Sequence, residues 1–172
     1  MNIINNTLFL EDISVETLMQ EYGSPLYVYE ESVLRSQFRQ LSSGFPEGLL
    51  EIHYSMKANS NPSLLKILRE EGSSIDAVSE FEVRLALESG FEPQQIIFTG
   101  HNNTLAEIEY CVEQEVAVHV GSPFLLEKFG QRFPHTSVSV RINPGIGAGH
   151  HAHCITGGPD SKFGIYHNQI DA

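Results

Sequence analysis

"EIHYSMKANSNPSLLKIL", residues 51–68, joins a short strand-like run to a polar turn and then to the start of a helix. Pro62 occupies a first-turn position of that helix, where a backbone N–H has no intrahelical partner, and Gly72 marks the helix end. Lys57 lies in the turn between the two elements. The stretch therefore predicts a strand–turn–helix unit with a lysine at the end of its strand.

The same kind of unit recurs along the chain at intervals of roughly 20 to 24 residues. One helical pattern opens with Ser79 and has Glu82 three positions later, which is typical of a capping box. Regular alternation of this kind favours parallel strands joined by helical crossovers, in either a doubly wound sheet or a (β/α)8 barrel. The expected strands are 51–55, 74–79, 95–100, 116–122 and 137–144, and the expected helices are 61–72, 79–90, 103–114 and 122–133.

Five units are visible, whereas a complete barrel needs eight units and about 250 residues. We therefore expect a fragment whose remaining units are missing. Ahead of the units, the pattern predicts a helix at 14–23, a strand at 24–30 and a helix at 31–45. We divide the chain into a lead-in segment, 1–35, and a partial barrel, 36–172.

The composition is that of a soluble globular protein, with 41% hydrophobic and 19% charged residues. The sequence has no apolar run of about 18 residues and no signal-peptide pattern at its start, so we expect a cytoplasmic protein without a membrane partner. A net charge of -12 argues against nucleic-acid binding. Cys111 and Cys154 lack the paired spacing of a zinc site and are expected to be reduced thiols.

Lysines are few, and two of the four, Lys66 and Lys128, fall in amphipathic helical patterns where a solvated lysine is ordinary. Lys57 differs because it ends a strand that we expect to be buried. Partial loss of water would lower the pKa of its ammonium group and free the amine to attack a carbonyl. A solvated lysine at a strand end remains the alternative.

The glycine-rich stretch after the fifth strand contains two patterns that suggest other ligands. "GIGAG", 145–149, resembles a dinucleotide-binding loop, but no helix and acidic residue follow at the required spacing. "GHHAH", 149–153, places three histidines close together, but the nearby carboxylates are limited to Asp160. We therefore expect no metal site.

Four motifs together resemble the fold-type III pyridoxal-phosphate decarboxylases. They are "YSMKAN" (54–59), "IDAVSEFEVRLALESGF" (75–91), "IIFTGHNNTLAEIEYCVE" (96–113) and "VRINPGIGAGHHAHCITGGPDSKFGI" (140–165). The sequence is most similar to family members that decarboxylate meso-2,6-diaminopimelate, from about Gly23 to the last residue. The resemblance implies an α/β fold, an incomplete (β/α)8 TIM-like barrel of the alanine-racemase-like, pyridoxal-phosphate-binding type, with about five of eight units present.

The resemblance also implies roles for five residues. Lys57 matches the lysine that holds pyridoxal 5'-phosphate through its amine, and Arg141 matches an arginine near the cofactor ring. Asp76 and Lys162 look like a paired acid and base below the ring, although they could equally be an ion pair that only braces the barrel. His150 is an active-site candidate, with a solvated loop residue as the alternative.

By this likeness the activity is decarboxylation of an amino acid, meso-2,6-diaminopimelate, to L-lysine in lysine biosynthesis, by a homodimer. In the family the phosphate cradle, a ring-stacking histidine and the acid at the pyridine nitrogen come from later strands, which this sequence does not contain. Three alternatives stay open: another basic amino acid or carboxy-polyamine decarboxylase, a non-catalytic single-barrel protein that binds pyridoxal phosphate, and a structural fragment without a cofactor.

Overall fold

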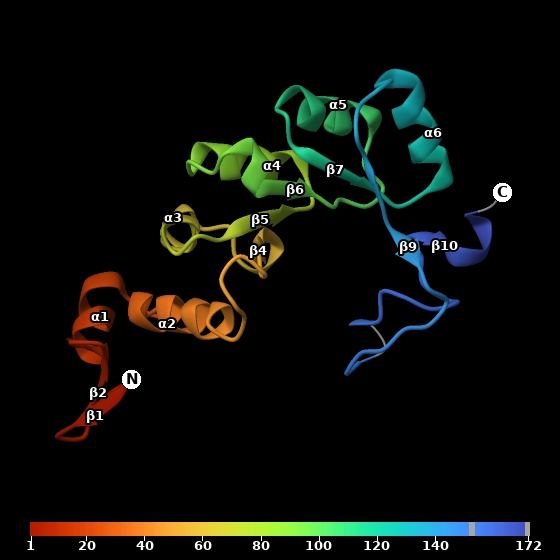
Figure 1. The fold of residues 1–172 in the computed structure, drawn as a ribbon. Helices are drawn as coiled ribbons and strands as arrows, with labels where there is room; N and C mark the ends of the chain where they lie inside the picture. The colour runs from red at the N-terminus through yellow and green to blue at the C-terminus, as the bar shows by residue number, and fades with distance from the viewer. Residues whose placement is uncertain (152–153, 171–172) are drawn as a thin grey trace. The chain divides into compact units, whose positions relative to one another are not determined.

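A computed structural model describes residues 1–151 and 154–170, which form two compact units, Met1–Leu50 and Glu51–Ala172. Each unit has its own elements, labelled in Figure 1. The boundary expected after residue 35 falls within helix α2 (Glu31–Ser42). The division into 1–35 and 36–172 stays a prediction.

The first unit begins with a three-stranded antiparallel sheet that we did not predict. Asn5 and Asn6 connect its first two strands, with φ angles of 50° and 63°. Two consecutive positive φ angles are typical of a type I′ hairpin turn, which asparagine tolerates, so an Asn-Asn pair between apolar runs was the available signal. The strands are β1 (Asn2–Ile4), β2 (Thr7–Leu10) and β3 (Ile13–Ser14).

Two helices complete the first unit. Helix α1 (Val15–Tyr22) is capped by Ser14, whose hydroxyl accepts a hydrogen bond from Thr17 N, and it ends at Gly23 as predicted. Helix α2 confirms the helix expected from residue 31. The strand expected at 24–30 is wrong, because this segment has no strand partner among the described residues.

The second unit is built on a five-stranded parallel sheet, and all five predicted strands are confirmed within it or directly beside it. The strands follow one another in the order of the chain, as in a β/α barrel, and within the described residues the sheet stays open with β4 and β8 at its edges. A separate two-stranded parallel pair lies beyond β8. The sheet contains β4 (His53–Ser55), β5 (Ser74–Ala77), β6 (Ile96–Phe98), β7 (Ala117–Val120) and β8 (Ser139–Val140), and the pair contains β9 (Ile142–Asn143) and β10 (Ile165–Tyr166).

The four predicted helices of this unit are confirmed, and their starting points follow from capping residues. Asn61, Ser79, Thr104 and Ser122 each accept a hydrogen bond from a backbone N–H of the first turn. At Ser79 the predicted capping box is only half formed, because the Glu82 carboxylate binds Val78 N instead. The helices are α3 (Pro62–Glu70), α4 (Glu80–Glu88), α5 (Leu105–Glu113) and α6 (Pro123–Arg132), with short 3-10 turns η1 (Met56–Ala58), η2 (Pro93–Gln95) and η4 (His167–Gln169).

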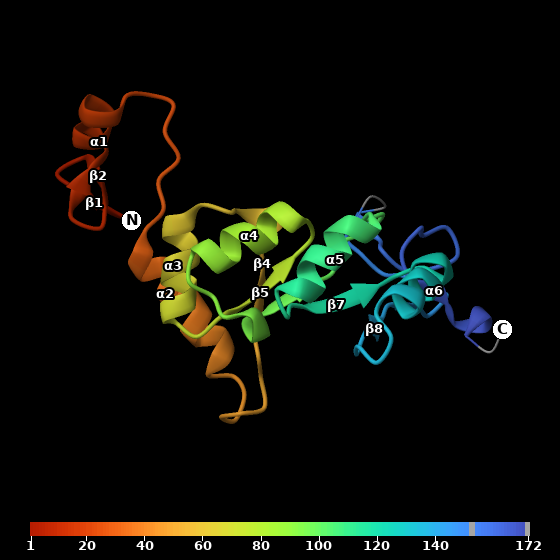
Figure 2. The same cartoon turned by 90° about the horizontal axis from the view of Figure 1, so that it is seen from above.

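The two faces of the parallel sheet differ sharply, because side chains alternate between faces along each strand. One face is apolar and lies under α4, α5 and α6, which Figures 1 and 2 show along the same side of the sheet. Its side chains are almost fully buried: Ile75, Ala77, Ile96, Phe98, Val118 and Val120. The opposite face carries half-buried and mostly polar side chains: His53, Ser55, Asp76, Ile97, Thr99 and His119.

Among the described residues, no helix is long and apolar enough to cross a membrane.

Candidate active site

The turn that carries Lys57 is fixed by hydrogen bonds on both sides. Tyr54 in β4 donates from its hydroxyl to the carbonyl oxygen of Asn59 (3.0 Å), and the Asn59 side chain accepts from Asn61 N (3.0 Å). Asn61 in turn caps α3 through Ser63 N (2.9 Å). The turn η1 therefore presents Lys57 at the carboxyl end of β4, which is the edge where parallel α/β proteins bind their ligands.

The environment of Lys57 differs from our expectation in one respect. We expected the amine to be partly removed from water, but Lys57 is exposed. One reason is that β4 is an edge strand, so within the described residues no further strand pairs with its outer edge. An exposed amine is accessible to a carbonyl compound.

Asp76 lies on the half-buried polar face of β5 and connects three neighbouring strands. Its Oδ2 accepts a hydrogen bond from Ser55 Oγ in β4 (2.6 Å), and its Oδ1 accepts one from Thr99 Oγ1, which follows β6. A third neighbour is His119 in β7, whose pKa is lowered mainly by burial while the charge of Asp76 opposes that shift. The carboxylate is thus aimed by two hydroxyl donors, and Ser55 lies only two residues before Lys57.

The ion pair suggested between Asp76 and Lys162 is not formed. The ion pairs of the described residues include neither side chain, and Lys162 instead lies with its Nζ 5.4 Å from the ring centroid of Phe163. The oxygens of Asp76 instead accept hydrogen bonds from Ser55 and Thr99, and the roles suggested for Asp76 and Lys162 stay a prediction.

A second group of side chains gathers around the ring of Phe163. The guanidinium carbon of Arg141 lies 4.7 Å from the ring centroid, and the ring of His101 lies 4.8 Å away, centroid to centroid. Burial lowers the pKa of His101, and the charges of Lys162 and Arg141 lower it further. The residues come from different elements, since His101 follows β6, Arg141 separates β8 from β9, and Phe163 precedes β10.

This second group is cationic and has no carboxylate within it. Arg141 is exposed, and among the described residues its guanidinium donates a hydrogen bond only to the carbonyl oxygen of Thr156 (3.2 Å). Within residues 1–151 and 154–170, neither Arg141 nor Lys162 forms an ion pair. In a chain of net charge -12, two such cations in contact with the same ring are suited to an anionic ligand.

His150 is exposed on the loop that follows β9. The described residues contain no group of three or more side chains that could hold a metal ion, and the expectation of no metal site stays a prediction. His153, the third histidine of "GHHAH", lies outside the described residues.

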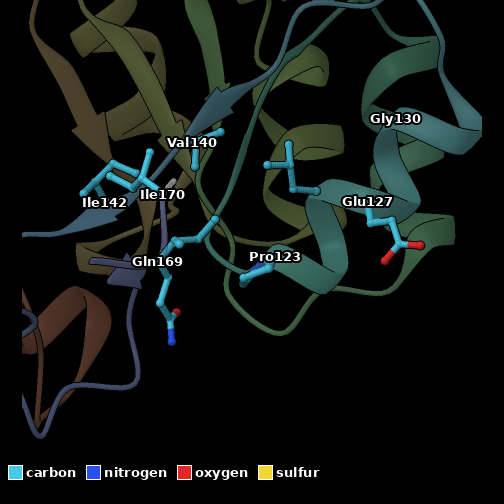
Figure 3. Close-up of a pocket in the computed structure, with 9 residues that line it drawn as sticks. Pro123, Glu127, Gly130, Val140, Ile142, Gln169 and Ile170 are labelled. Atoms are coloured by element: carbon cyan, nitrogen blue, oxygen red, sulfur yellow. The ribbon is translucent and has the colours of Figure 1, made fainter. Parts of the chain in front are cut away.

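An apolar pocket of the second unit lies elsewhere, between α6 and the strands β8 to β10 (Figure 3). It measures about 480 Å³ and contains none of the predicted site residues. Val140 is 37% exposed there, although it is in register with the fully buried Val120 of β7. Because it has no basic side chain in its lining, the pocket is not suited to a phosphate group. Its lining residues are Pro123, Leu126, Glu127, Gly130, Val140, Ile142, Ile165, Gln169 and Ile170.

Sequence reasoning did not identify four contributors to the site: Ser55, Thr99, His101 and Phe163. Ser55 and Thr99 lie on the same sheet face as Asp76, so the alternation of side chains along the strands was a usable signal. His101 was recognised only as a residue after a strand. For Phe163 the sequence carried no signal, because its ring meets Arg141 only through the course of a long loop.

Comparison with known proteins agrees with this geometry. Residues 31–172 match the family model described as "Pyridoxal-dependent decarboxylase, pyridoxal binding domain". The chain therefore belongs to the pyridoxal-dependent decarboxylase family, and the matched part is its pyridoxal-binding domain. The expected cofactor, pyridoxal 5'-phosphate, and the expected fold class are confirmed by this match and by the structural relatives.

Among similar proteins, the diaminopimelate decarboxylase of Methanothermobacter thermautotrophicus is 42% identical over 151 residues, which cover 86% of this chain and 35% of that protein. The crystal structure of Helicobacter pylori diaminopimelate decarboxylase complexed with L-lysine aligns with a TM-score of 0.81 at 32% identity, covering 88% of this chain and 40% of that one. The lysine/ornithine decarboxylase of Vibrio vulnificus, complexed with putrescine, aligns with a TM-score of 0.64 at 27% identity, covering 69% and 32%. The chain thus spans well under half the length of these relatives.

The described residues fit the cofactor chemically. Lys57 offers an accessible amine for an aldehyde, and Arg141 and Lys162 offer positive charge without a competing carboxylate. Pyridoxal phosphate carries a net negative charge, which is complementary to the positive charges of Arg141 and Lys162.

Proposed function

We propose that this chain is the cofactor-binding part of a pyridoxal-phosphate-dependent decarboxylase that converts meso-2,6-diaminopimelate to L-lysine. The observation that carries the proposal is the 42% identity, over most of this chain, to a protein named diaminopimelate decarboxylase. A structural relative of the same name was crystallised with L-lysine, the product of that reaction.

The roles of the site residues belong to this proposal. Bound pyridoxal phosphate supplies a conjugated ring that accepts the electrons released when a carboxylate leaves as carbon dioxide. Lys57 would hold the cofactor through Nζ and, once the amino group of the substrate has displaced it, the freed Nζ would supply a proton to the carbon that has lost its carboxylate. Arg141 and Lys162 bind and orient anionic groups, and Asp76 provides a fixed carboxylate near Lys57. His150, on the exposed loop, is the most peripheral of the five.

The localisation, oligomeric state and partners of the whole protein are part of the same proposal. We infer a cytoplasmic homodimer that acts on a small amino acid and has no nucleic-acid or membrane partner. The acidic net charge of -12 supports the exclusion of nucleic acid. The open edges of the sheet at β4 and β8 support further pairing, either with more of the polypeptide or with another subunit.

Chemical labelling tests the role of Lys57. The chain is incubated with pyridoxal phosphate, reduced with borohydride and mapped by peptide mass spectrometry. We expect the label on Lys57, its loss in Lys57→Ala, and its retention in Lys66→Ala, which removes another exposed lysine from the same unit. Equal labelling of Lys57, Lys66 and Lys162 would contradict the assignment.

A second candidate substrate class has support from the similarity to the Vibrio vulnificus lysine/ornithine decarboxylase. A chimera in which residues 31–172 replace the matching part of the Methanothermobacter thermautotrophicus enzyme tests whether this domain supports decarboxylation. We expect carbon dioxide release from diaminopimelate that exceeds release from ornithine, and no release in the Lys57→Ala chimera. A preference for ornithine would favour the second class.

A further inference from the structure

The loop between β9 and β10 is closed by one buried side chain, Asn143. This residue is only 2% exposed, although it lies at the end of a two-residue strand. Its Nδ2 donates to the carbonyl oxygens of Gly158 and Phe163 (3.1 Å each). Its Oδ1 accepts from Gly145 N and Gly158 N (3.0 Å each). Three of these bonds join the start of the loop to its far end, and the bond from Gly145 N fixes the first turn of the loop.

The chemistry of this closure is specific to an amide side chain. A carboxamide offers two donor hydrogens and two acceptor lone pairs, and here each of them is used. Aspartate has the same shape and could accept from the two backbone N–H groups, but it would set a negative oxygen against the two carbonyls. At Gly158, whose φ is 96°, both the N–H and the carbonyl face Asn143, so this glycine is fixed in a conformation that other residues rarely adopt.

A second contact supports the closure from β10. The hydroxyl of Tyr166 lies within hydrogen-bonding distance of the carbonyl oxygens of Gly158 (3.0 Å), Pro159 (2.6 Å) and Ser161 (3.2 Å). A single hydroxyl donates one hydrogen bond at a time, so these carbonyls share it. Tyr166 thus restrains the same end of the loop that Asn143 holds.

The closed loop determines where the cationic groups lie. Asn143 binds the backbone of Phe163, and the ring of Phe163 is the surface on which Arg141 and Lys162 meet. The loop also supplies the Thr156 carbonyl that accepts from the Arg141 guanidinium. Without closure, the contacts that hold both exposed cations at the ring of Phe163 would be lost.

We propose that Asn143 is a positioning residue that closes the β9–β10 loop and so holds Arg141 and Lys162 together as one anion-binding group. The identity of the anion rests on the proposed function, under which the anion is a group of the cofactor or of the substrate. The closure itself does not depend on that function.

The test uses the 172-residue chain with Asn143→Asp and a matched control, Asn168→Asp, at an exposed asparagine of η4. The first measurement is the initial rate of trypsin cleavage after Lys162, with cleavage after Lys128 in α6 as the internal reference. The second is the pyridoxal phosphate concentration that gives half-maximal borohydride labelling of Lys57.

In Asn143→Asp we expect the rate of cleavage after Lys162 to rise about tenfold, with the rate after Lys128 unchanged. We also expect half-maximal labelling to need about fivefold or more pyridoxal phosphate, whereas Asn168→Asp matches the unmodified chain. Tyr166→Phe, which removes one hydroxyl from the same closure, should change both measurements in the same direction by less.

Two results would overturn the inference. One is an equal rise in cleavage after Lys162 and Lys128 in both Asn143→Asp and Tyr166→Phe, which would show general destabilisation. The other is an opened loop with unchanged half-maximal labelling, which would leave Asn143 a purely structural residue. If the unmodified chain does not label Lys57 at all, the proposed function fails, but the cleavage measurement still decides whether Asn143 closes the loop.

Discussion

Removing the hydroxyl groups that hold Asp76 should weaken the second unit by a measurable amount. Ser55 and Thr99 each donate a hydrogen bond to one carboxylate oxygen of Asp76. Hydrogen bonds to charged groups contribute about 1.5–3 kcal/mol, and the half-buried setting moves the expected effect toward the lower end. We therefore expect Thr99→Val and Ser55→Ala each to lower the free energy of unfolding by about 1–2 kcal/mol.

A double-mutant cycle isolates the contribution of the hydrogen bond. Urea unfolding of the 172-residue chain, followed by circular dichroism, is measured for Thr99→Val, Asp76→Asn and the double variant. A coupling energy of about 1 kcal/mol is expected, because asparagine keeps the shape of Asp76 but not its charge. Thr136→Val, at an exposed position after α6, is the control. A coupling below about 0.3 kcal/mol, within the error of additivity, would refute the view that the hydroxyl aims the carboxylate.

Two further predictions concern the reactivity and titration of the second unit. Burial raises the pKa of the Cys111 thiol to about 12, so at pH 8 only about one part in 10,000 of this thiol is thiolate. We therefore expect only one thiol per chain, the exposed Cys154, to react rapidly with a disulfide reagent. Rapid reaction of two thiols per chain before urea is added would contradict the burial of Cys111. Burial also lowers the pKa of His119, so the unfolded chain takes up a proton at a higher pH than the native chain and stability should fall as pH drops below about 6.5. His119→Asn should flatten that decline in urea titrations, whereas His135→Asn, at an exposed position, should not; equal slopes in the two variants would argue against the assignment.

The prediction of elements was most accurate where several local signals agree. In α3 and α6 a capping side chain and a first-turn proline point to the same boundary, so each helix starts where the sequence suggested. At 24–30 the apolar and aromatic residues have a high strand propensity, yet the segment is not a strand. Strand propensity measures how well a residue fits into a β-sheet. A strand also needs a neighbouring strand as hydrogen-bond partner, which 24–30 does not have among the described residues.

In the candidate site, too, residues with a local signal were recognised from the sequence, whereas contacts between distant residues were not. Lys57 was found from the sequence because it directly follows a strand of a regular β/α repeat, whereas Asp76 was suggested only by the resemblance to the family. An ion pair between Asp76 and Lys162 is not formed among the described residues, and the sequence carried no local signal on this point because the two residues are 86 positions apart. The partners of Asp76, Ser55 and Thr99, lie on the two strands beside it in the sheet.

By itself, the sequence determined the alternation of strands and helices, the starts of the helices, and the delivery of Lys57 to a strand end. These features depend on side-chain periodicity and capping, which act over a few residues. Only the tertiary structure decided that Arg141, Lys162 and His101 meet on the ring of Phe163, and that Asn143 closes the loop that brings them there. The physical reason is that strand pairing and loop closure set the distances between residues far apart in the chain, and sequence spacing carries no record of those distances.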